Sequence, residues 1–228
     1  MSTAGAAVVR CVAAIATAIE TDRDWLTELD SAIGDADHGG NMARGWAAAA
    51  AAVGEFDDPT PETVVKQTGR TLMAEVGGAA GPLYGGSLLF ASAELADGLT
   101  TETAVAFAET YLEKLTDRGG ARLGDATMVD AVTPAVHALR AAIEVDGATP
   151  VAALAAAVTA ARRGMAGTVG LRANKGRASY LGWRSVGHQD PGATSTVIIC
   201  ETILEVLADE LDEPVPSVPA VTVHDPDA

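Results

Sequence analysis

Apolar residues recur at intervals of three and four along most of the chain, which is the period of one face of an α-helix. The alternation of apolar and polar residues that marks a half-buried strand is nearly absent. The pattern therefore predicts an all-α protein with eight main helices and one short helix. The expected ranges are 3–21, 39–54, 60–76, 84–97, 101–117, 127–145, 149–167 and 193–209, with the short helix near 23–31.

Local start and stop signals agree with these helix ranges. Thr60-Pro61 has the form of a helix start, because proline favours the first helical turn. Asp146-Gly147 marks a break between two helices. Short connections join antiparallel neighbours, so we expect an up-and-down bundle or barrel of eight helices. We assign residues 1–212 to one helical domain and expect residues 213–228, which contain four prolines, to form a flexible tail.

Composition limits the classes of partner. The 228 residues carry a formal net charge of −16 at pH 7, which argues against general nucleic-acid binding and against attraction to anionic membranes. No run of 18 apolar residues is free of charge, and the N-terminus has no signal-peptide layout, so we expect no membrane span and a cytoplasmic location. Cys11 and Cys200 lie in apolar helical contexts, which favours buried thiols over a disulfide.

Three aspartates lie within eight residues of one glycine-bearing segment. Asp30, Asp35 and Asp37 precede a predicted helix that begins near His38 and Asn41. Mg²⁺ prefers hard oxygen ligands in a compact octahedron and often shares them with a substrate's phosphates. Glycine permits the tight turns that let short Asp side chains converge. We therefore predict a Mg²⁺ site in this loop, with the start of the following helix available to an anion.

For each aspartate taken alone, a turn in which Asp and Gly only cap and bend the chain is the better interpretation. Three carboxylates beside His38 and Asn41 favour the metal site instead. An EF-hand is excluded, because the twelfth position counted from Asp35 is Trp46, where that motif needs a bidentate Glu.

A second segment, Gly77–Gly86, has five glycines in ten residues and a helix start at Pro82. The N–H groups of such a loop can approach a phosphate closely. Alternatively, the segment is a helix–helix connection in which glycine avoids clashes, and the sequence alone leaves both interpretations open. No P-loop and no dinucleotide-binding fingerprint is present.

Basic residues are segregated in and before the predicted long loop Thr168–Thr194. No Asp or Glu occurs between Gly147 and Gln189. Six of the chain's fifteen Lys and Arg residues fall there, namely Arg162, Arg163, Arg172, Lys175, Arg177 and Arg184. A solvated helix face normally mixes both signs of charge. The segment therefore suits an anion, either the phosphates of a nucleotide or the acidic surface of a protein.

No nucleophile with an adjacent base stands out in the sequence. Asp190 alone is best read as a helix cap, and Asp125 or Thr127 as another, while Met128 is either a core residue or a neighbour of a nucleobase. A metal loop, glycine-rich loops and a basic segment without a nucleophile suit phosphoryl transfer, which depends on positioning and charge neutralisation.

Several stretches, in matching order, resemble the nucleotide-binding L subunit of dihydroxyacetone kinase. They are Gly34–Met42, Gly77–Gly85, Gly124–Ala131, Lys175–Gly182 and Arg184–Ala193, and together they span most of the chain up to about residue 210. The resemblance implies an eight-helix barrel that holds ADP or ATP through two Mg²⁺ ions at one end.

The same resemblance implies the residues that hold these cofactors. Asp30, Asp35 and Asp37 would hold the metal ions. The nucleotide would be surrounded by His38, Gly39, Gly40, Asn41, Ala79, Ala80, Gly119, Met128, Arg177, Asp190, Pro191 and Gly192. Arg177 would also be catalytic, by steadying the transferring phosphoryl group together with loop N–H groups.

Two protein partners are implied as well. One is the dihydroxyacetone-binding subunit, which holds the ketone through its own histidine, and the other is a phosphohistidine protein of the phosphotransferase system that recharges bound ADP to ATP. Because the chain lacks the ketone-binding domain, we expect this unfused form rather than a fused ATP-dependent enzyme. An ATP-dependent kinase for another keto-sugar such as erythrulose, and a non-catalytic helical interaction module, are the alternatives.

Three positions depart from the family pattern. Ala36 stands where the family usually has Gly, Ala80 where it has Ser, and Trp183 where it often has an acidic residue. We expect the backbone at Ala36 to accept a Cβ, as most backbone conformations do. Ala80 keeps the N–H that an anion would use, and Trp183 lies where contacts with a partner are expected.

Overall fold

The computed structural model describes residues 3–218, and within that range the secondary structure consists of helices without a strand. The predicted all-α class is confirmed. The α-helices are α1 (Thr3–Thr21), α2 (Arg23–Ile33), α3 (His38–Gly54), α4 (Pro61–Glu75), α5 (Gly86–Ala91), α6 (Thr101–Gly119), α7 (Val129–Glu144), α8 (Pro150–Gly167) and α9 (Pro191–Leu211). Most boundaries lie within two residues of the predicted ones.

The predicted helix 84–97 is the exception. The structure instead has a π-helical turn, η1 (Gly81–Gly85), then α5, then a 3₁₀ turn, η2 (Ser92–Leu95). Close packing explains this irregularity, because a Cβ at Gly85 would lie 2.5 Å from the carbonyl oxygen of Gly69 in α4. The two backbones touch there, and the wider π turn accommodates the contact.

The long segment predicted as a loop also contains helix. Two 3₁₀ elements, η3 (Thr168–Gly170) and η4 (Arg177–Ser185), interrupt it. Gly182, at φ 60° and ψ −127°, kinks η4 internally. η3 has three residues and the kink at Gly182 divides η4, so neither element is long enough to produce a recognisable period of apolar positions, and the sequence pattern missed both.

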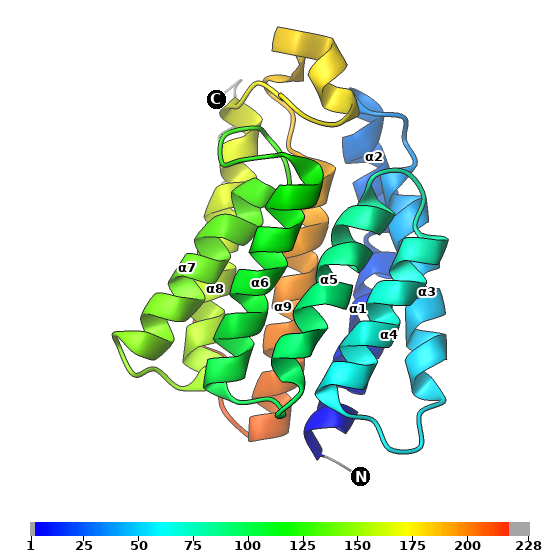
Figure 1. Cartoon of the computed structure of the whole chain (residues 1–228). Helices are drawn as coiled ribbons and strands as arrows, with labels where there is room; N and C mark the ends of the chain where they lie inside the picture. Colours follow the sequence, from blue (N-terminus) through cyan, green and yellow to red (C-terminus); the bar gives the residue numbers. More distant parts are fainter. Residues whose placement is uncertain (1–2, 219–228) are drawn as a thin grey trace.

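Helices that follow one another lie side by side, and the last returns to the first. α3 packs on α4, then the contacts run through α5, α6, α7 and α8 to α9, which packs on α1, and α1 packs on α3. Figure 1 shows this ring from the side, with α2 and η4 at the end opposite the N-terminus. Loops at that end therefore come together although they are distant in sequence.

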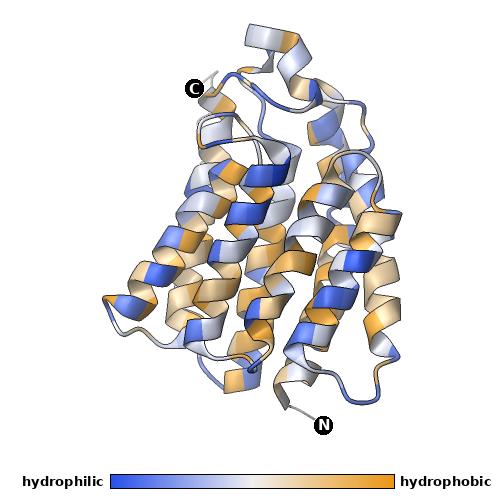
Figure 2. Cartoon of the chain, in the orientation of Figure 1, coloured by the Kyte–Doolittle hydropathy of each residue, from blue (hydrophilic) through white to orange (hydrophobic). Residues whose placement is uncertain are grey.

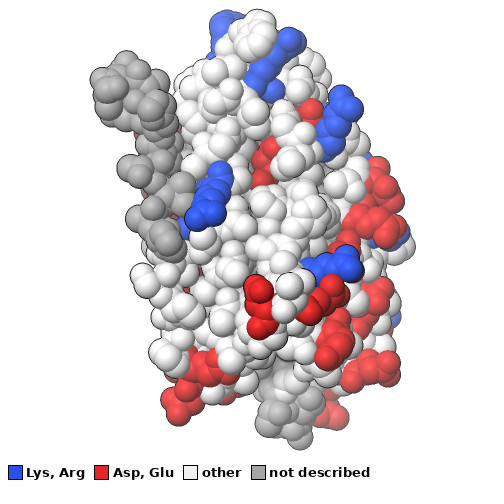
Figure 3. Space-filling model, turned by 90° about the vertical axis from the view of Figure 1, so that its left-hand side faces the viewer, with Lys and Arg blue, Asp and Glu red and all other residues white. Residues whose placement is uncertain are grey.

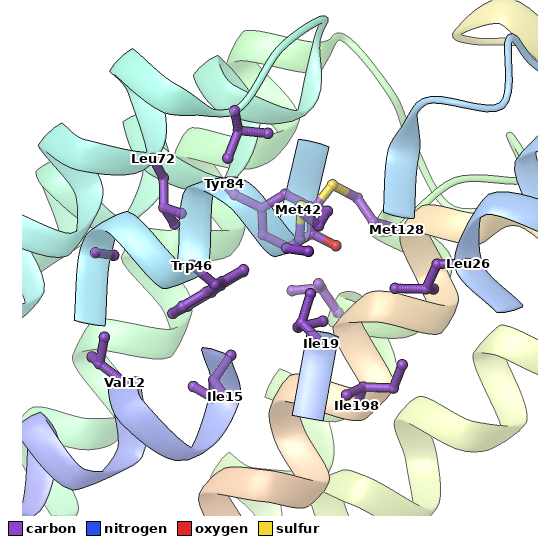
Figure 4. Packing of buried hydrophobic residues seen from close by; sticks show 14 of the residues in the cluster. Val12, Ile15, Ile19, Leu26, Met42, Trp46, Leu72, Tyr84, Met128 and Ile198 are labelled. Atoms are coloured by element: carbon purple, nitrogen blue, oxygen red, sulfur yellow. The ribbon is translucent and has the colours of Figure 1, made fainter. Parts of the chain in front are cut away.

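The interior of the ring is filled with apolar side chains. Figure 2 shows hydrophobic positions concentrated toward the inside and hydrophilic positions on outward faces. Ile19, Leu26, Met42, Trp46 and Tyr84 are buried in one cluster (Figure 4). The few large side chains suffice because alanine and glycine let other helices approach closely, as α7 and α8 do where Gly164 meets the carbonyl oxygen of Asp130.

Helix caps fix several of the boundaries. Thr60 and Thr100 each form a capping box with the residue three positions later, and Thr149 accepts a hydrogen bond from Ala152 N–H. The predicted start at Thr60-Pro61 is confirmed, and α6 begins at Thr101 as predicted, directly after its cap Thr100.

Two helices, α1 and α9, are long and apolar enough to cross a membrane by length and composition, although each contains charged residues. In the structure these helices pack on each other, and Ile15 and Ile19 of α1 and Val197 of α9 are buried in the protein core. Core helices of a bundle meet the same criterion, so this finding is weak support for a membrane span.

The two cysteines carry free thiols in the structure. Cys11 is buried in α1 and Cys200 is half-buried in α9. Burial raises the pKa of the Cys11 thiol to about 11 and that of Cys200 to about 12, so both thiols stay protonated and unreactive near neutral pH.

The end of α9 leads into the predicted tail. Asp212, in the left-handed conformation, caps the helix, and residues 213–218 carry no helix. The Val218 side chain packs against a cluster that includes Val151 and Leu204. The rest of the predicted tail, residues 219–228, lies outside the described residues.

Candidate functional site

The three predicted metal ligands converge at the end of α2. Asp30 lies in its last turn and is 8 % exposed, whereas Asp35 and Asp37 are exposed in the loop before α3. One carboxylate oxygen of each residue lies within 4.8 Å of the others. Oxygens around one Mg²⁺ are about 3 to 4 Å apart, and a pair of ions about 3.5–4 Å apart spreads its ligands further. The donor type and spacing therefore fit Mg²⁺.

Asp30 is also the structural centre of the loop. Its Oδ2 accepts hydrogen bonds from the backbone N–H groups of Asp37, at 2.9 Å, and His38, at 3.2 Å. A Cβ at Gly34 would lie 2.0 Å from Asp30 Oδ1, so a side chain there would displace the Asp30 carboxylate. The carboxylate of Asp30 thus shapes the turn that presents Asp35 and Asp37.

Ala36 occupies a backbone position that favours glycine. Its φ is 59°, in the left-handed region. The backbone carries the Cβ of Ala36, as expected, but in a region where an L residue costs about 1 kcal/mol relative to glycine. The loop keeps the conformation because the hydrogen bonds to Asp30 hold it.

Arg177 reaches the metal loop from η4. Its Nε lies 2.8 Å from Asp35 Oδ2, and both side chains are partly exposed. The apolar contacts of Ala178 and Leu181 with Ile33 hold η4 against the end of α2. The structure thus brings together a cation and a carboxylate that are separated by more than 140 residues, beside the three-aspartate cluster.

The start of α3 is adjacent to this cluster. Asp37 occupies the N-cap position without a side-chain cap hydrogen bond, which leaves its carboxylate available to a metal. Gly39 packs on α2, where a Cβ would lie 2.1 Å from the carbonyl oxygen of Arg23, whereas Gly40 faces open space. Asn41 Oδ1 accepts a hydrogen bond from Arg44 at 2.8 Å.

The glycine-rich segment serves mainly to pack helices. A Cβ at Gly81 would lie 2.3 Å from the carbonyl oxygen of Val76, and Gly85 meets α4. At these two positions glycine avoids clashes between helices, which is the second of the two interpretations given above. Gly78, at φ 65° with open space beside it, retains the features of a binding loop, and the neighbouring Ala79 is exposed. Gly77 lies against the Asn41 side chain, so this loop borders the start of α3.

The remaining predicted site residues border the same end. Asp190 caps α9 by accepting a hydrogen bond from Ala193 N–H at 2.6 Å, as expected, and burial raises the pKa of its carboxyl to about 7. Gly192 approaches Met128, which is buried in the main core cluster. Ala80 also packs against that cluster, and Gly119, at the end of α6, lies close to Leu83 of η1.

A buried hydroxyl cluster, which the sequence did not reveal, connects three of these segments. Tyr84 Oη lies 2.8 Å from Ser195 Oγ and 3.0 Å from Thr196 Oγ1, and it donates to the Gly192 carbonyl oxygen at 2.9 Å. His38 Nε2 lies 2.9 Å from the same Ser195 Oγ. The start of α3, the π turn η1 and the start of α9 therefore meet at one point.

Burial controls the protonation of this cluster. It lowers the pKa of His38, so the imidazole is neutral near pH 7 and forms a hydrogen bond with Ser195. It raises the pKa of Tyr84, so the phenol remains a donor. Serine and threonine at positions 195 and 196, inside an apolar helix, were the signal available in the sequence, because buried hydroxyls need partners.

We expect Ser195→Ala to weaken ligand binding at the site and to lower the stability of the fold. It leaves His38 and Tyr84 without a shared partner, at a cost of about 1–2 kcal/mol. Ser92→Ala is a matched control, because Ser92 is buried and donates to the Leu89 carbonyl oxygen away from the site. Thermal unfolding should show similar losses for both variants, whereas only Ser195→Ala should weaken ADP binding, about tenfold. Equal ADP affinities would limit the cluster to a structural role.

Comparison with known proteins identifies the family to which the chain belongs. The DAK2 domain pattern matches residues 32–205. The chain belongs to the DAK2 domain family. Its helices superimpose on a dihydroxyacetone kinase from C. freundii, crystallised with AMP-PNP and Mg²⁺, with a TM-score of 0.68 and 26 % identity over 88 % of this chain. The DAK2 domain described here corresponds to 34 % of that longer enzyme.

Curated relatives of this DAK2 domain include nucleotide-binding subunits. The chain is 40 % identical over 185 residues to the ADP-binding subunit of the PEP-dependent dihydroxyacetone kinase of Escherichia coli, covering 80 % of this chain and 88 % of that subunit. It is 38 % identical over 190 residues to the PTS-dependent counterpart of Lactococcus lactis, covering 83 % and 91 %. A D-erythrulose kinase of Mycolicibacterium smegmatis is 35 % identical over 203 residues, and the match covers 87 % of this chain and 35 % of that enzyme.

Proposed function

We propose that this chain is the ADP/ATP-binding subunit of a dihydroxyacetone kinase. It passes a phosphoryl group through Mg-bound nucleotide to dihydroxyacetone held on a partner subunit. The observation that carries the proposal is the convergence of Asp30, Asp35 and Asp37 at one end of the bundle, with Arg177 on the Asp35 carboxylate. Relatives named as ADP-binding subunits over nearly their whole length support it.

Within this proposal, the three aspartates hold two Mg²⁺ ions with the nucleotide. When bound, the ions neutralise phosphate charge during transfer. Asp30 is fixed by its two backbone hydrogen bonds, so the ligand set is preorganised rather than assembled on binding.

The start of α3 receives the phosphates. Within residues 3–218, the N–H groups of Gly39 and Gly40 have no acceptor, because they precede the first complete turn of the helix. Such groups attract anions. His38 directs its side chain to Ser195 rather than to the solvent, so it contributes to the site through its backbone.

Arg177 stabilises the charge of the transferring phosphoryl group. Its guanidinium is held beside the metal loop by Asp35 before any phosphate arrives, so little reorganisation is needed. We assign the remaining predicted nucleotide contacts to Asn41, the Ala79-Ala80 segment, Gly119, Met128 and the Asp190-Pro191-Gly192 turn, which border the same end of the bundle.

The donor in this proposal is a phosphohistidine protein of the phosphotransferase system, and the reaction takes place in the cytoplasm. The names of the E. coli and L. lactis relatives support this donor. A second candidate is a subunit of an ATP-dependent kinase for another keto-sugar. The D-erythrulose kinase relative favours it, because a similar unit serves a different acceptor there.

Reconstitution distinguishes these functions. The chain is mixed with a dihydroxyacetone-binding subunit, catalytic ADP and Mg²⁺, and supplied either with phosphoenolpyruvate and the phosphotransferase proteins or with ATP. We expect dihydroxyacetone phosphate to form from phosphoenolpyruvate without net consumption of nucleotide. Product that forms only with stoichiometric ATP, or only from erythrulose, would favour the second candidate. No transfer from either donor would favour a helical interaction module.

A further inference from the structure

Two large aromatic side chains stand out from the surface near the candidate site. Tyr180 is 87 % exposed and Trp183 is 74 % exposed, and both belong to η4. In folded proteins Trp is highly buried on average and Tyr is intermediate. A pair of exposed aromatic residues on one short element is typical of a protein-binding surface, where Trp and Tyr are the usual anchors.

The element that carries these aromatic residues is fixed in place. Ser185 Oγ accepts a hydrogen bond from Ala173 N–H at 2.9 Å and donates to the Gly182 carbonyl oxygen at 2.8 Å. Asn174 donates to Asp125 through both its backbone and its side chain. A preorganised surface loses little entropy when it binds, so η4 is suited to specific docking rather than to loose contact.

Basic side chains surround the aromatic pair. The Arg172 guanidinium lies over the Trp183 ring, 5.4 Å from its centre, and Arg184 follows directly in the sequence. Across residues 3–218, neither Arg172 nor Arg184 forms an ion pair with an acidic side chain. Figure 3 shows Lys and Arg at the upper end of the molecule, where η4 lies, and most acidic residues further down.

The position of this surface relates it to phosphoryl transfer. Arg177 lies three residues before Tyr180 in η4 and contacts Asp35 in the metal loop. Figure 1 shows η4 as a cap over the end of the bundle that holds this loop. A protein that brings an alcohol to a nucleotide bound there would contact η4 on approach, and an apolar rim would help to exclude water from the transfer.

We propose that Arg172, Tyr180, Trp183 and Arg184, the Trp183 surface, dock the subunit that carries the phosphoryl acceptor. This inference rests on the proposed function. The partner's facing surface is expected to have an apolar recess for Trp183 and acidic residues around it, opposite to the arginines in charge. We favour the acceptor-carrying subunit over the phosphoprotein donor as the partner. A kinase that uses ATP needs an acceptor carrier but no phosphoprotein donor, and units similar to this chain occur within longer kinases.

The test compares two double variants, each of which replaces one exposed apolar residue and one arginine by alanine. Trp183→Ala/Arg184→Ala removes an anchor and a charge from the Trp183 surface. Val145→Ala/Arg140→Ala removes an exposed apolar side chain and an arginine from the end of α7, far from η4. Binding of dihydroxyacetone-loaded acceptor subunit, Mg-ADP binding and recharging of bound ADP by the phosphoprotein donor are measured for both variants and wild type.

We expect the first double variant to bind the acceptor subunit about 30-fold more weakly, with Mg-ADP binding and recharging within about twofold of wild type. The α7 variant should match wild type in all three. Acceptor binding within about threefold of wild type would overturn the inference, as would loss of recharging with acceptor binding retained, which assigns the surface to the donor. A wild-type chain that binds the acceptor subunit but not Mg-ADP would instead contradict the proposed function.

Discussion

Asp37→Asn should weaken Mg-dependent ADP binding on the order of 100-fold or more, while the helical fold remains intact. The substitution removes a charge and keeps the volume of the side chain. Asp37 is exposed, and its carboxylate makes no hydrogen bond or ion pair within the described part of the chain, so the folded protein does not depend on it. Calorimetric titration with ADP in Mg²⁺ measures the affinity, and circular dichroism measures helix content and thermal unfolding.

Two comparisons make this result specific. Glu28→Gln, at an exposed position of α2, removes one acidic charge outside the cluster and should leave ADP binding unchanged. Asp30→Asn should reduce both affinity and stability, because Asp30 accepts hydrogen bonds from the backbone of the metal loop. Wild-type affinity in Asp37→Asn would remove that residue from the metal site.

Arg177→Gln should slow phosphoryl transfer far more than it weakens nucleotide binding. Loss of a preorganised charge that acts on the transferring group typically costs about 10²–10³ in rate. The Arg177–Asp35 pair is partly exposed, so its loss should change stability by less than about 1 kcal/mol. Single-turnover transfer from bound ATP to dihydroxyacetone, with saturating partner subunit, isolates the chemical step, and ADP titration gives the affinity.

Arg177→Lys and Arg163→Gln are the controls for this rate effect. Lysine keeps the positive charge but lacks the planar guanidinium group with its several N–H donors, so Arg177→Lys should retain part of the rate. Arg163 is exposed on α8, outside the cluster around Asp35, and its loss should change neither quantity. If the affinity of Arg177→Gln for ADP collapses while bound nucleotide is still transferred at the normal rate, Arg177 only anchors the nucleotide.

The fold was largely predictable from the sequence because the long helices have a strong period of apolar positions. Helices such as α1 and α4 begin and end within a residue of prediction, and caps such as Thr60 explain why. The pattern failed where helix geometry is irregular, at η1 and η4. There, contacts between distant backbones, such as Gly85 with Gly69, decide the conformation, and a single sequence does not display such contacts.

The site was predictable in part for the same reason. Asp30, Asp35 and Asp37 are close in sequence, so their convergence follows from one loop. The pairing of Arg177 with Asp35 depends on the packing of η4 against α2, and the Tyr84–Ser195–His38 cluster depends on three elements meeting in the core. The left-handed conformation of Ala36 was not predictable, because it is imposed by hydrogen bonds to Asp30 that only the folded loop shows.

The most direct test of the account is to measure nucleotide binding by the wild-type chain alone. The protein is purified in Mg²⁺ without added nucleotide and denatured, any released nucleotide is identified, and a stripped sample is titrated with ADP and with ATP in Mg²⁺ or in EDTA. We predict one nucleotide per chain, held only when Mg²⁺ is present. Release of ADP or ATP from the purified protein would also support a nucleotide retained through turnover. A chain that binds neither nucleotide in Mg²⁺ would contradict the account.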